Sequence, residues 1–201
     1  DGYKFVFFSL AALGLADFLD FRVDILQAND WHTATAIYAL EKLDLDSPNL
    51  KHTRTLHTLH NLPYMGFGVQ QALLEYGLPP VKVSALPEWA RHTPLPLGLL
   101  FADRIIAVSP HYAEEILTPE FGCGLEDFLK LKKGKINGIL NGLDTERWNP
   151  ESDSQIKQNF STESLALRSI NKLALQDQFN LMQDESIPIL TLISRKKKKK
   201  G

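Results

Sequence analysis

The sequence predicts an α/β protein, built on a Rossmann-like parallel sheet with helices on both faces. Short apolar segments of strand length alternate along the chain with longer segments whose apolar residues recur at helical spacing. Polar turn and cap residues, such as Asn29-Asp30 and Ser109-Pro110, separate the two kinds of segment. Alternation of this kind favours parallel strands, with a helix in each connection between them.

The first elements are a helix over residues 5–19 and a short buried strand over residues 23–26. The helix is apolar and is expected to be buried. Ser9, Gly14 and Asp17 interrupt it, so it is too short and too polar to span a bilayer. A basic segment does not precede it, and we therefore expect no signal peptide.

Further strands and helices follow in alternation. The strands are expected at residues 53–59, 104–108, 135–140 and 187–193. The helices are expected at residues 31–43, 69–76 and 163–179. Ser109 opens a further helix as its N-cap, with Pro110 in the first turn. Residues 79–96 are rich in proline and are expected to form a loop with at most one helical turn.

Polar side chains follow five of the predicted strands at their carboxyl ends. They are Asn29-Asp30-Trp31-His32, His60-Asn61, Ser109-Pro110, Asn141-Gly142-Leu143-Asp144 and Ser194-Arg195. The carboxyl ends of parallel strands share one edge of the sheet, and ligands of such sheets bind there. The pattern predicts a small-molecule site at this edge without identifying the ligand.

Composition and charge exclude some classes of function. Hydrophobic residues make up 44% and charged residues 23% of the 201 residues, the balance of a globular protein. The net charge of -2 gives no reason to expect binding to nucleic acid or to an anionic membrane. Cys123 is the single cysteine, so an intrachain disulfide and a metal site with two cysteines are both excluded. A reducing, cytoplasmic setting fits this cysteine usage.

Six segments carry distinctive residue combinations. They are residues 27–34 (QANDWHTA), 58–66 (TLHNLPYMG), 102–116 (ADRIIAVSPHYAEEI), 121–126 (FGCGLE), 138–150 (GILNGLDTERWNP) and 171–176 (NKLALQ). Together, and in this order, they resemble glycosyltransferase family 5, the bacterial glycogen synthases and plant starch synthases. The resemblance runs from about residue 3 to residue 195.

The resemblance implies half of a two-domain enzyme of the GT-B architecture. Residues 1–150 would be a partial N-terminal Rossmann-like domain, residues 151–186 a connecting helical segment, and residues 187–201 the start of a C-terminal nucleotide-sugar-binding domain. The family's opening K-T-G-G-L segment and most of its second domain are absent from this sequence. We therefore expect the chain alone to be inactive. Its incomplete sheet should expose apolar edges, so we expect the chain either to self-associate or to be part of a larger molecule.

The activity implied is a retaining hexosyl transfer. Glucose would pass from ADP-glucose, or less often UDP-glucose, to the non-reducing end of an α-1,4-glucan. No metal or other cofactor is implied, because cationic side chains and helix N-termini neutralise the diphosphate in this family. The compartment implied is the cytoplasm, or the plastid if the source is a plant.

The resemblance also assigns roles to individual residues. His60 would hydrogen-bond the donor glucose near its reacting carbon, and Asp30 would lie close to that sugar; both are predicted catalytic residues. Asn141 and Gly142 would line the glucose pocket, and Arg195 would contact the diphosphate through its planar guanidinium.

One further predicted substrate-binding residue has weaker support. Lys200 falls where the family has a phosphate-contacting lysine. It belongs to a run of five lysines, residues 196–200, and a match inside a homopolymer carries little weight.

Each assignment has a structural alternative. Asp30 could merely cap the helix that follows it, and His60 could be a buried core histidine. Asn141-Gly142 would serve any tight turn. Trp31 and Trp148 could pack in the core or stack on sugars.

Two other function classes stay open. One is a non-catalytic glucan-binding module that uses aromatic residues such as Tyr64 and Trp89. The other is a related GT-B transferase with another donor.

Overall fold

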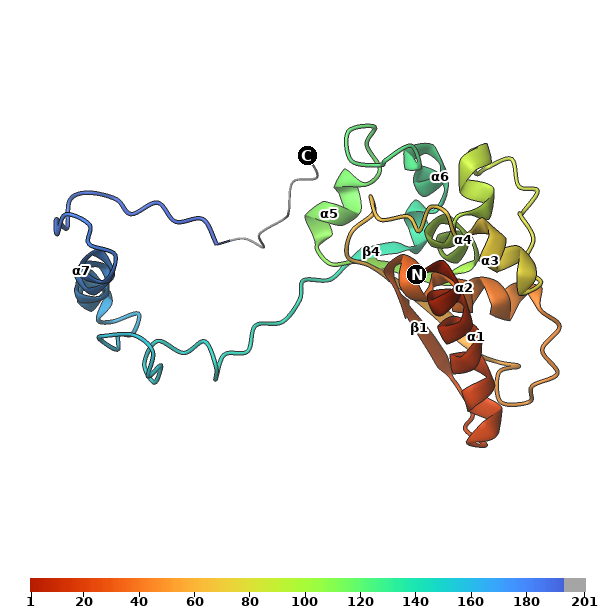
Figure 1. Cartoon of the computed structure of the whole chain (residues 1–201), viewed down its shortest axis with the longest axis horizontal. Helices are drawn as coiled ribbons and strands as arrows, with labels where there is room; N and C mark the ends of the chain where they lie inside the picture. The colour runs from red at the N-terminus through yellow and green to blue at the C-terminus, as the bar shows by residue number, and fades with distance from the viewer. Residues whose placement is uncertain (194–201) are drawn as a thin grey trace. The chain divides into compact units, whose positions relative to one another are not determined.

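A four-stranded parallel sheet organises the first part of the chain (Figure 1). Its strands, in order across the sheet, are β1 (Ile25–Asn29), β2 (Arg54–Leu59), β3 (Arg104–Ala107) and β4 (Ile136–Gly138). All three strand pairings are parallel. The predicted α/β class with a parallel sheet is therefore confirmed.

The structure is a computed structural model, and it describes residues 1–193. The chain divides into two compact units, the first spanning Asp1–Asn141 and the second beginning at Gly142. The sheet belongs to the first unit.

The central strands lie where the sequence predicted them. β2 alternates buried Thr55, His57 and Leu59 on one face, and Leu56 pairs with Gln27 on one side and Arg104 on the other. The first strand is shifted from its predicted position at residues 23–26. The hydrogen-bonded pairing of β1 with β2 continues beyond the apolar residues to Asn29. Backbone pairing, and not side-chain polarity, decides where a strand ends.

In the first unit, one helix precedes the first strand, and the others lie in the connections between strands. They are α1 (Gly2–Phe18), α2 (Asp30–Lys42), α3 (Gln70–Glu75), η1 (Glu88–His92), α4 (Pro94–Phe101), α5 (Pro110–Glu115), α6 (Glu126–Leu131) and η2 (Lys133–Lys135). α2 is the central helix, since it packs against both α1 and α4 as well as against β1 and β2. The predicted helices at residues 31–43 and 69–76 are confirmed by α2 and α3.

The first helix is buried on one side only. Val6, Ser9, Leu13 and Ala16 recur at helical spacing and are buried, whereas Phe18 is 84% exposed. The expectation of a buried helix is thus wrong for the outer face. Within residues 1–193, no helix has the length and apolar character needed to cross a membrane.

The loop predicted over residues 79–96 ends earlier, because α4 begins at Pro94. Pro94 stands in the first turn of α4, and Thr93 is its N-cap residue. The N–H groups of a first turn have no partner inside a helix, so prolines cost little there. Their number in this segment had suggested a loop, although the residues from Leu95 to Leu99 are fully buried as a helix.

The second unit contains the helix α7 (Arg168–Gln178), preceded by the short η3 (Leu165–Leu167). Two polar side chains of α7 bind neighbouring loops. Asn171 accepts a hydrogen bond from the Gln158 N–H at 2.8 Å and donates to the Gln158 carbonyl at 2.7 Å. Gln176 makes the same reciprocal pair with the Asp184 backbone, at 3.0 and 3.1 Å. These motif residues therefore stabilise the unit.

The strand predicted at residues 187–193 is wrong for the described structure. These residues have no regular secondary structure, and Leu190, Leu192 and Ile193 are at least 90% exposed. A strand needs a backbone partner for its N–H and C=O groups. None of the strands within residues 1–193 pairs with this segment.

Candidate functional site

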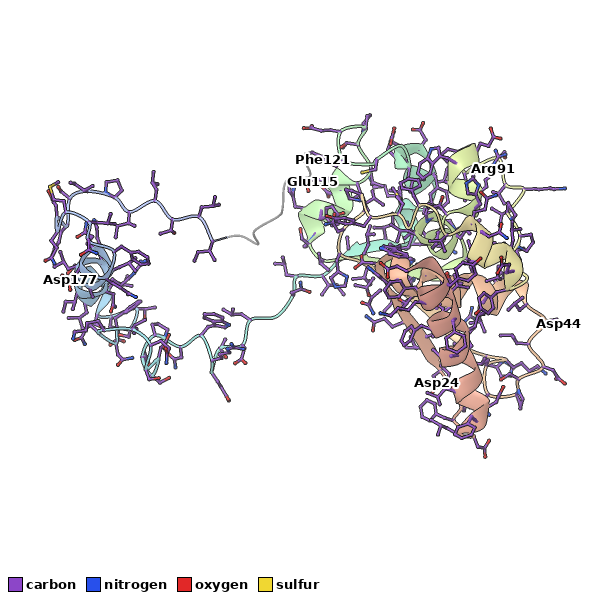
Figure 2. The ribbon with its side chains drawn as sticks, viewed as in Figure 1. Asp24, Asp44, Arg91, Glu115, Phe121 and Asp177 are labelled. Atoms are coloured by element: carbon purple, nitrogen blue, oxygen red, sulfur yellow. The ribbon has the colours of Figure 1, made fainter. Side chains whose placement is uncertain are left out.

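The two edges of the sheet differ in character. Figure 2 shows Asp24, just before β1, and Glu115, on the helix that follows β3, toward opposite ends of the first unit. The carboxyl ends of the strands lie on the Glu115 side, and the predicted site residues Asp30 and His60 follow β1 and β2 there.

Asp30 has an uncommon backbone conformation and reaches across to the next strand. Its φ is +51°, in the left-handed region that non-glycine residues seldom adopt. One carboxylate oxygen accepts hydrogen bonds from the N–H groups of His60, at 2.7 Å, and Asn61, at 3.3 Å. The other lies 3.1 Å from Nδ1 of His60. Asp30 thus binds both the backbone and the ring of the His60 segment.

The start of α2 is secured by a different residue. The hydroxyl of Thr33 accepts from the Asn29 N–H at 2.6 Å and donates to the Asn29 carbonyl at 2.9 Å. The carboxylate of Asp30 makes no cap hydrogen bond to α2. The alternative in which Asp30 only caps its helix therefore does not hold.

His60 stands at the surface of this edge. Its side chain is 43% exposed, so it is not a buried core histidine. The carboxylate of Asp30 holds the ring through Nδ1, which leaves Nε2 as the nitrogen able to meet a ligand.

His57 lies beneath the site and is fully buried. Its Nε2 is 3.2 Å from the Asp30 carbonyl oxygen, which can only accept, so Nε2 carries the proton. Burial lowers the pKa of His57 to about 4, with the contacts to Asp30 acting in the opposite direction. The ring is neutral at physiological pH and supports the strained turn at Asp30 from below.

The helix α5, which follows the third strand, contributes Tyr112. Ser109 caps α5 as predicted, because its hydroxyl accepts from the Tyr112 N–H at 3.0 Å. The phenol oxygen of Tyr112 accepts from the N–H of Leu62 at 2.8 Å. Burial raises the pKa of Tyr112, so its hydroxyl stays neutral. Sequence analysis gave Tyr112 no role in the site, although the residue lies within the family motif at residues 102–116.

The aromatic residues beside Asp30 pack against each other. The rings of Phe5, Trp31 and His32 lie 4.3–5.0 Å apart between centroids. A side chain at Gly66 would come within 2.7 Å of the Trp31 ring, and Gly66 has a φ of +83°. The core alternative for Trp31 is therefore supported, since the ring fills space between α1 and the loop after β2.

The remaining predicted residues are not gathered around His60 by any described contact. Asn141 and Gly142 are exposed beyond the last ladder bond of β4, which Ile139 donates to Ala107 at 2.9 Å. Asn141 ends the first unit and Gly142 begins the second. Arg195 and Lys200 lie outside the described residues.

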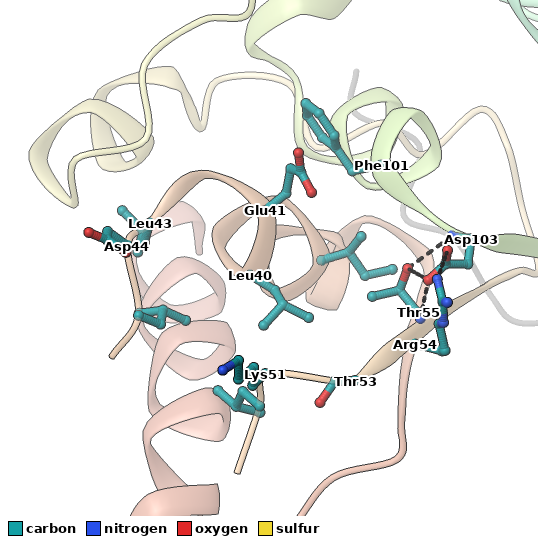
Figure 3. Close-up of a pocket in the computed structure, with 13 residues that line it drawn as sticks. Leu40, Glu41, Leu43, Asp44, Lys51, Thr53, Arg54, Thr55, Phe101 and Asp103 are labelled. Carbon is teal, nitrogen blue, oxygen red and sulfur yellow. Dashed lines mark hydrogen bonds and ion pairs between the residues drawn. The ribbon is translucent and has the colours of Figure 1, made fainter. Parts of the chain in front are cut away.

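A cavity of about 390 Å³ lies at the opposite, amino edge of the sheet (Figure 3). Asp103 stands at its rim and accepts from the Thr55 N–H at 2.9 Å and from Arg54 at 3.4 Å. The Thr55 hydrogen bond is the main cause that lowers the pKa of Asp103. These polar groups join β2 to β3, and the cavity is remote from the predicted site.

A histidine and a carboxylate thus meet at the carboxyl ends of parallel strands, which is where α/β proteins commonly bind their ligands. Comparison with known proteins identifies the family. The family model for the starch synthase catalytic domain matches residues 1–131, and the chain belongs to this family. The resemblance noted in the sequence is thereby confirmed.

Individual relatives agree with this assignment. The chain is similar to glycogen synthase from Bacillus cereus (39% identity over 204 residues) and to glycogen synthase from Streptococcus agalactiae (35% over 211 residues). Each match covers 100% of this chain and 43% of the relative. The chain therefore spans less than half the length of these curated relatives.

A solved structure is similar throughout most of the chain. It is the catalytic domain of starch synthase IV from Arabidopsis thaliana bound to ADP and acarbose, with a TM-score of 0.74 and 32% sequence identity. The match covers 92% of this chain and 39% of the plant protein chain. The similarity confirms the fold class.

Proposed function

We propose that this chain is part of a glycogen or starch synthase that transfers glucose from ADP-glucose to the non-reducing end of an α-1,4-glucan, with retention. The Asp30–His60 pair at the carboxyl edge of the sheet is the observation that carries this proposal. Family membership supports it. A similar plant protein was solved with ADP and acarbose bound, which supports a nucleotide-sugar donor and a glucan acceptor.

His60 would act on the donor sugar through Nε2. With the Nδ1–H donated to the Asp30 carboxylate, Nε2 of the neutral ring is the nitrogen that would accept a hydrogen bond from a glucose hydroxyl. Positive charge develops on the sugar as the bond to the diphosphate breaks, and the Asp30 carboxylate beside His60 would place negative charge near it. We therefore assign His60 to substrate contact and Asp30 to its support within the same catalytic pair.

The other predicted residues complete the proposal. Asn141 and Gly142 would line the glucose pocket, and Arg195 and Lys200 would contact the diphosphate. Cationic groups of this kind neutralise a diphosphate without a metal, and none is proposed. The protein would act in the cytoplasm.

The domain assignment also stays a proposal. Residues 1–150 would form the N-terminal domain and residues 151–186 the connection, and residues 187–201 would begin the nucleotide-sugar-binding domain. Because the chain spans 43% of its relatives, we propose that the remaining transition-state contacts come from polypeptide outside this sequence. The 201 residues alone would then be inactive.

The proposal is tested by glucose transfer in two proteins. One is the chain itself. The other is a chimera in which residues 1–193 replace the matching segment of the Bacillus cereus glycogen synthase, to which the chain is 39% identical. Labelled ADP-glucose and UDP-glucose are supplied separately, with glycogen as acceptor. We expect no incorporation by the chain alone and incorporation from ADP-glucose by the chimera.

Replacing His60 tests whether glucose transfer depends on this site. In the chimera, His60→Ala should lower the rate by a factor on the order of 100 to 10,000, the usual contribution of a positioned acid–base or hydrogen-bonding group. His52→Ala is the matched control, because His52 is exposed in the loop before β2. A folded chimera that transfers no glucose, or a His60→Ala variant with full activity, would refute the proposal.

A second candidate function has one observation in its favour. Tyr64 and Phe67 are more than half exposed, and the Phe67 and Trp89 rings lie 5.5 Å apart between centroids. Exposed aromatic faces can stack on sugars, as a glucan-binding module would require. Retention of the chain on a glycogen affinity gel, combined with an inactive folded chimera, would favour this function over the first.

A further inference from the structure

Three successive backbone N–H groups after β2 each donate to a side chain from another strand's carboxyl end. The N–H groups of His60 and Asn61 donate to Asp30, which follows β1. The N–H of Leu62 donates to the hydroxyl of Tyr112, in the helix after β3, at 2.8 Å. The segment that carries His60 is therefore held from both neighbouring strands.

The hydrogen bond from Leu62 cannot readily be replaced by water. Leu62 has no solvent-exposed surface, and the phenol oxygen of Tyr112 is the acceptor of its N–H. A buried N–H without a partner carries the full cost of desolvation. If the hydroxyl is removed, the segment must either bear that cost or shift until the N–H reaches another acceptor.

Tyr112 is itself fixed in place. Its own N–H donates to the cap residue Ser109 at 3.0 Å, and its ring packs against the hydrophobic core. Burial raises its pKa, so the hydroxyl stays protonated throughout the neutral range. A neutral phenol held at both ends is suited to define the position of the chain it binds.

We propose that Tyr112 is a positioning residue for His60, which it fixes through the backbone of Leu62 while Asp30 fixes the ring and the two preceding N–H groups. The proposal rests on the proposed function, since it assigns His60 to the donor sugar. Tyr112 would not touch the substrate. It would keep the imidazole where the reacting sugar needs it, and small displacements of such groups reduce rates strongly.

The matched control is another tyrosine hydroxyl. Tyr38, in α2, donates to the Pro79 carbonyl and lies outside the site. Tyr38→Phe and Tyr112→Phe each remove one partly buried hydroxyl and keep the ring. A difference between the two variants at the His60 segment therefore reports on Tyr112's position and not on the general loss of a hydrogen bond.

The first measurement is amide hydrogen exchange in the 201-residue chain, followed residue by residue by NMR. We expect Tyr112→Phe to speed exchange at His60, Asn61 and Leu62 by about tenfold, the effect of losing one hydrogen bond. Amides of β1 should change little, and Tyr38→Phe should leave all three groups protected. Unchanged protection at Leu62 in Tyr112→Phe would overturn the proposal.

The second measurement is steady-state kinetics in the active chimera. Tyr112→Phe should lower kcat by about tenfold with less than a twofold change in KM for donor and glucan, the signature of a contact needed in the transition state. Tyr38→Phe should leave both constants unchanged. Faster exchange together with an unchanged kcat would reduce Tyr112 to a structural role and overturn the proposal.

The two measurements separate failure of this inference from failure of the proposed function. If the folded chimera with Tyr112 intact transfers no glucose, the proposed function fails and the positioning role fails with it. The exchange data then still decide whether Tyr112 holds the segment. If the chimera is active, only the Tyr112→Phe results bear on this inference.

Discussion

At the scale of the residue, His57 shows how burial sets protonation beneath the site. The ring is fully buried and donates from Nε2 to the Asp30 carbonyl, while Nδ1 has no hydrogen-bond partner among the described residues. Adding a proton would place a charge in this apolar setting. That is why burial lowers the pKa from 6.5 to about 4.

This pKa predicts a pH dependence of stability. Between pH 6.5 and about 4 the unfolded chain binds a proton at His57 and the native chain does not. The stability that the neutral, buried His57 contributes should therefore be present in full above pH 6.5. The free energy of unfolding should fall by at most about 3 kcal/mol as the pH drops through this window. Urea unfolding from pH 7 to pH 4 measures it.

A matched pair of variants isolates the His57 contribution. His57→Gln should be less stable at pH 7 but should flatten the pH dependence between pH 6.5 and 4. His52→Gln, at an exposed position, should show the same dependence of the free energy of unfolding on pH as the parent protein. If His57→Gln loses stability toward low pH as steeply as the parent, burial of a neutral His57 is not the cause.

The residue contacts at the site show what the sequence could and could not predict. The cap by Ser109 was predictable because its partner Tyr112 is three residues away, and caps have a local signature. The bond between Asp30 and His60 joins residues 30 positions apart, and that between Leu62 and Tyr112 joins residues 50 apart. Local patterns place such residues on one edge of the sheet but do not specify which atoms meet.

At the scale of the element, α4 illustrates how tertiary packing overrides local preference. Two prolines and a glycine, Pro94, Pro96 and Gly98, disfavour a helix in isolation, yet α4 packs against α2 with its residues 94–99 buried. The absence of a side chain at Gly98 allows this close approach, because a Cβ there would lie 2.7 Å from Cε1 of His57. The glycine, one of the residues that suggested a loop, is therefore needed for the close packing of α4.

Replacing this glycine should therefore destabilise the fold. Gly98→Ala would place its Cβ 2.8 Å from that of Ala34 and within 2.7 Å of His57. Overpacking costs about 1–3 kcal/mol, and the better helix propensity of alanine returns at most about 1 kcal/mol. We expect a net loss of about 1–2 kcal/mol in the free energy of unfolding, measured by urea denaturation at pH 7.

The same substitution at an open position is the control. Gly14 lies in α1 with nothing within 4 Å of its Cβ position, so Gly14→Ala should stabilise the chain by about 0.5–1 kcal/mol. Opposite signs for the two variants would assign the effect at Gly98 to packing. A neutral or stabilising Gly98→Ala would mean that α4 and β2 separate at little cost.

At the scale of the whole molecule, family resemblance predicted more than local patterns did. Alternating segments predict a parallel sheet, but not which relatives the chain has. The ordered motifs identified the family, which the family model over residues 1–131 confirms. The strand expected at residues 187–193 is absent, since a single segment cannot form a sheet alone and none of the strands within residues 1–193 pairs with it.

Exposed apolar side chains form a surface on the first unit. Phe7, Phe8 and Phe18 of α1 are each more than half exposed, and Ile25 of the edge strand β1 is 65% exposed. A shallow groove of about 200 Å³ runs beside them. Its lining is Ala12, Leu15, Ala16, Leu19, Phe21 and Val23. Apolar area of this kind beside an open strand edge favours burial against another polypeptide.

In a solution of the purified chain, the only available partner is a second copy. We therefore expect the sedimentation coefficient to rise with protein concentration, as two copies bury the outer face of α1 against each other. Phe18→Lys, at a position 84% exposed, should keep the chain folded and prevent association by placing a charge in the contact. Phe179→Lys is the control, because Phe179 is 63% exposed but follows α7 in the second unit. A chain that stays monomeric at every concentration, or associates equally in both variants, would show that α1 is not the surface that self-associates.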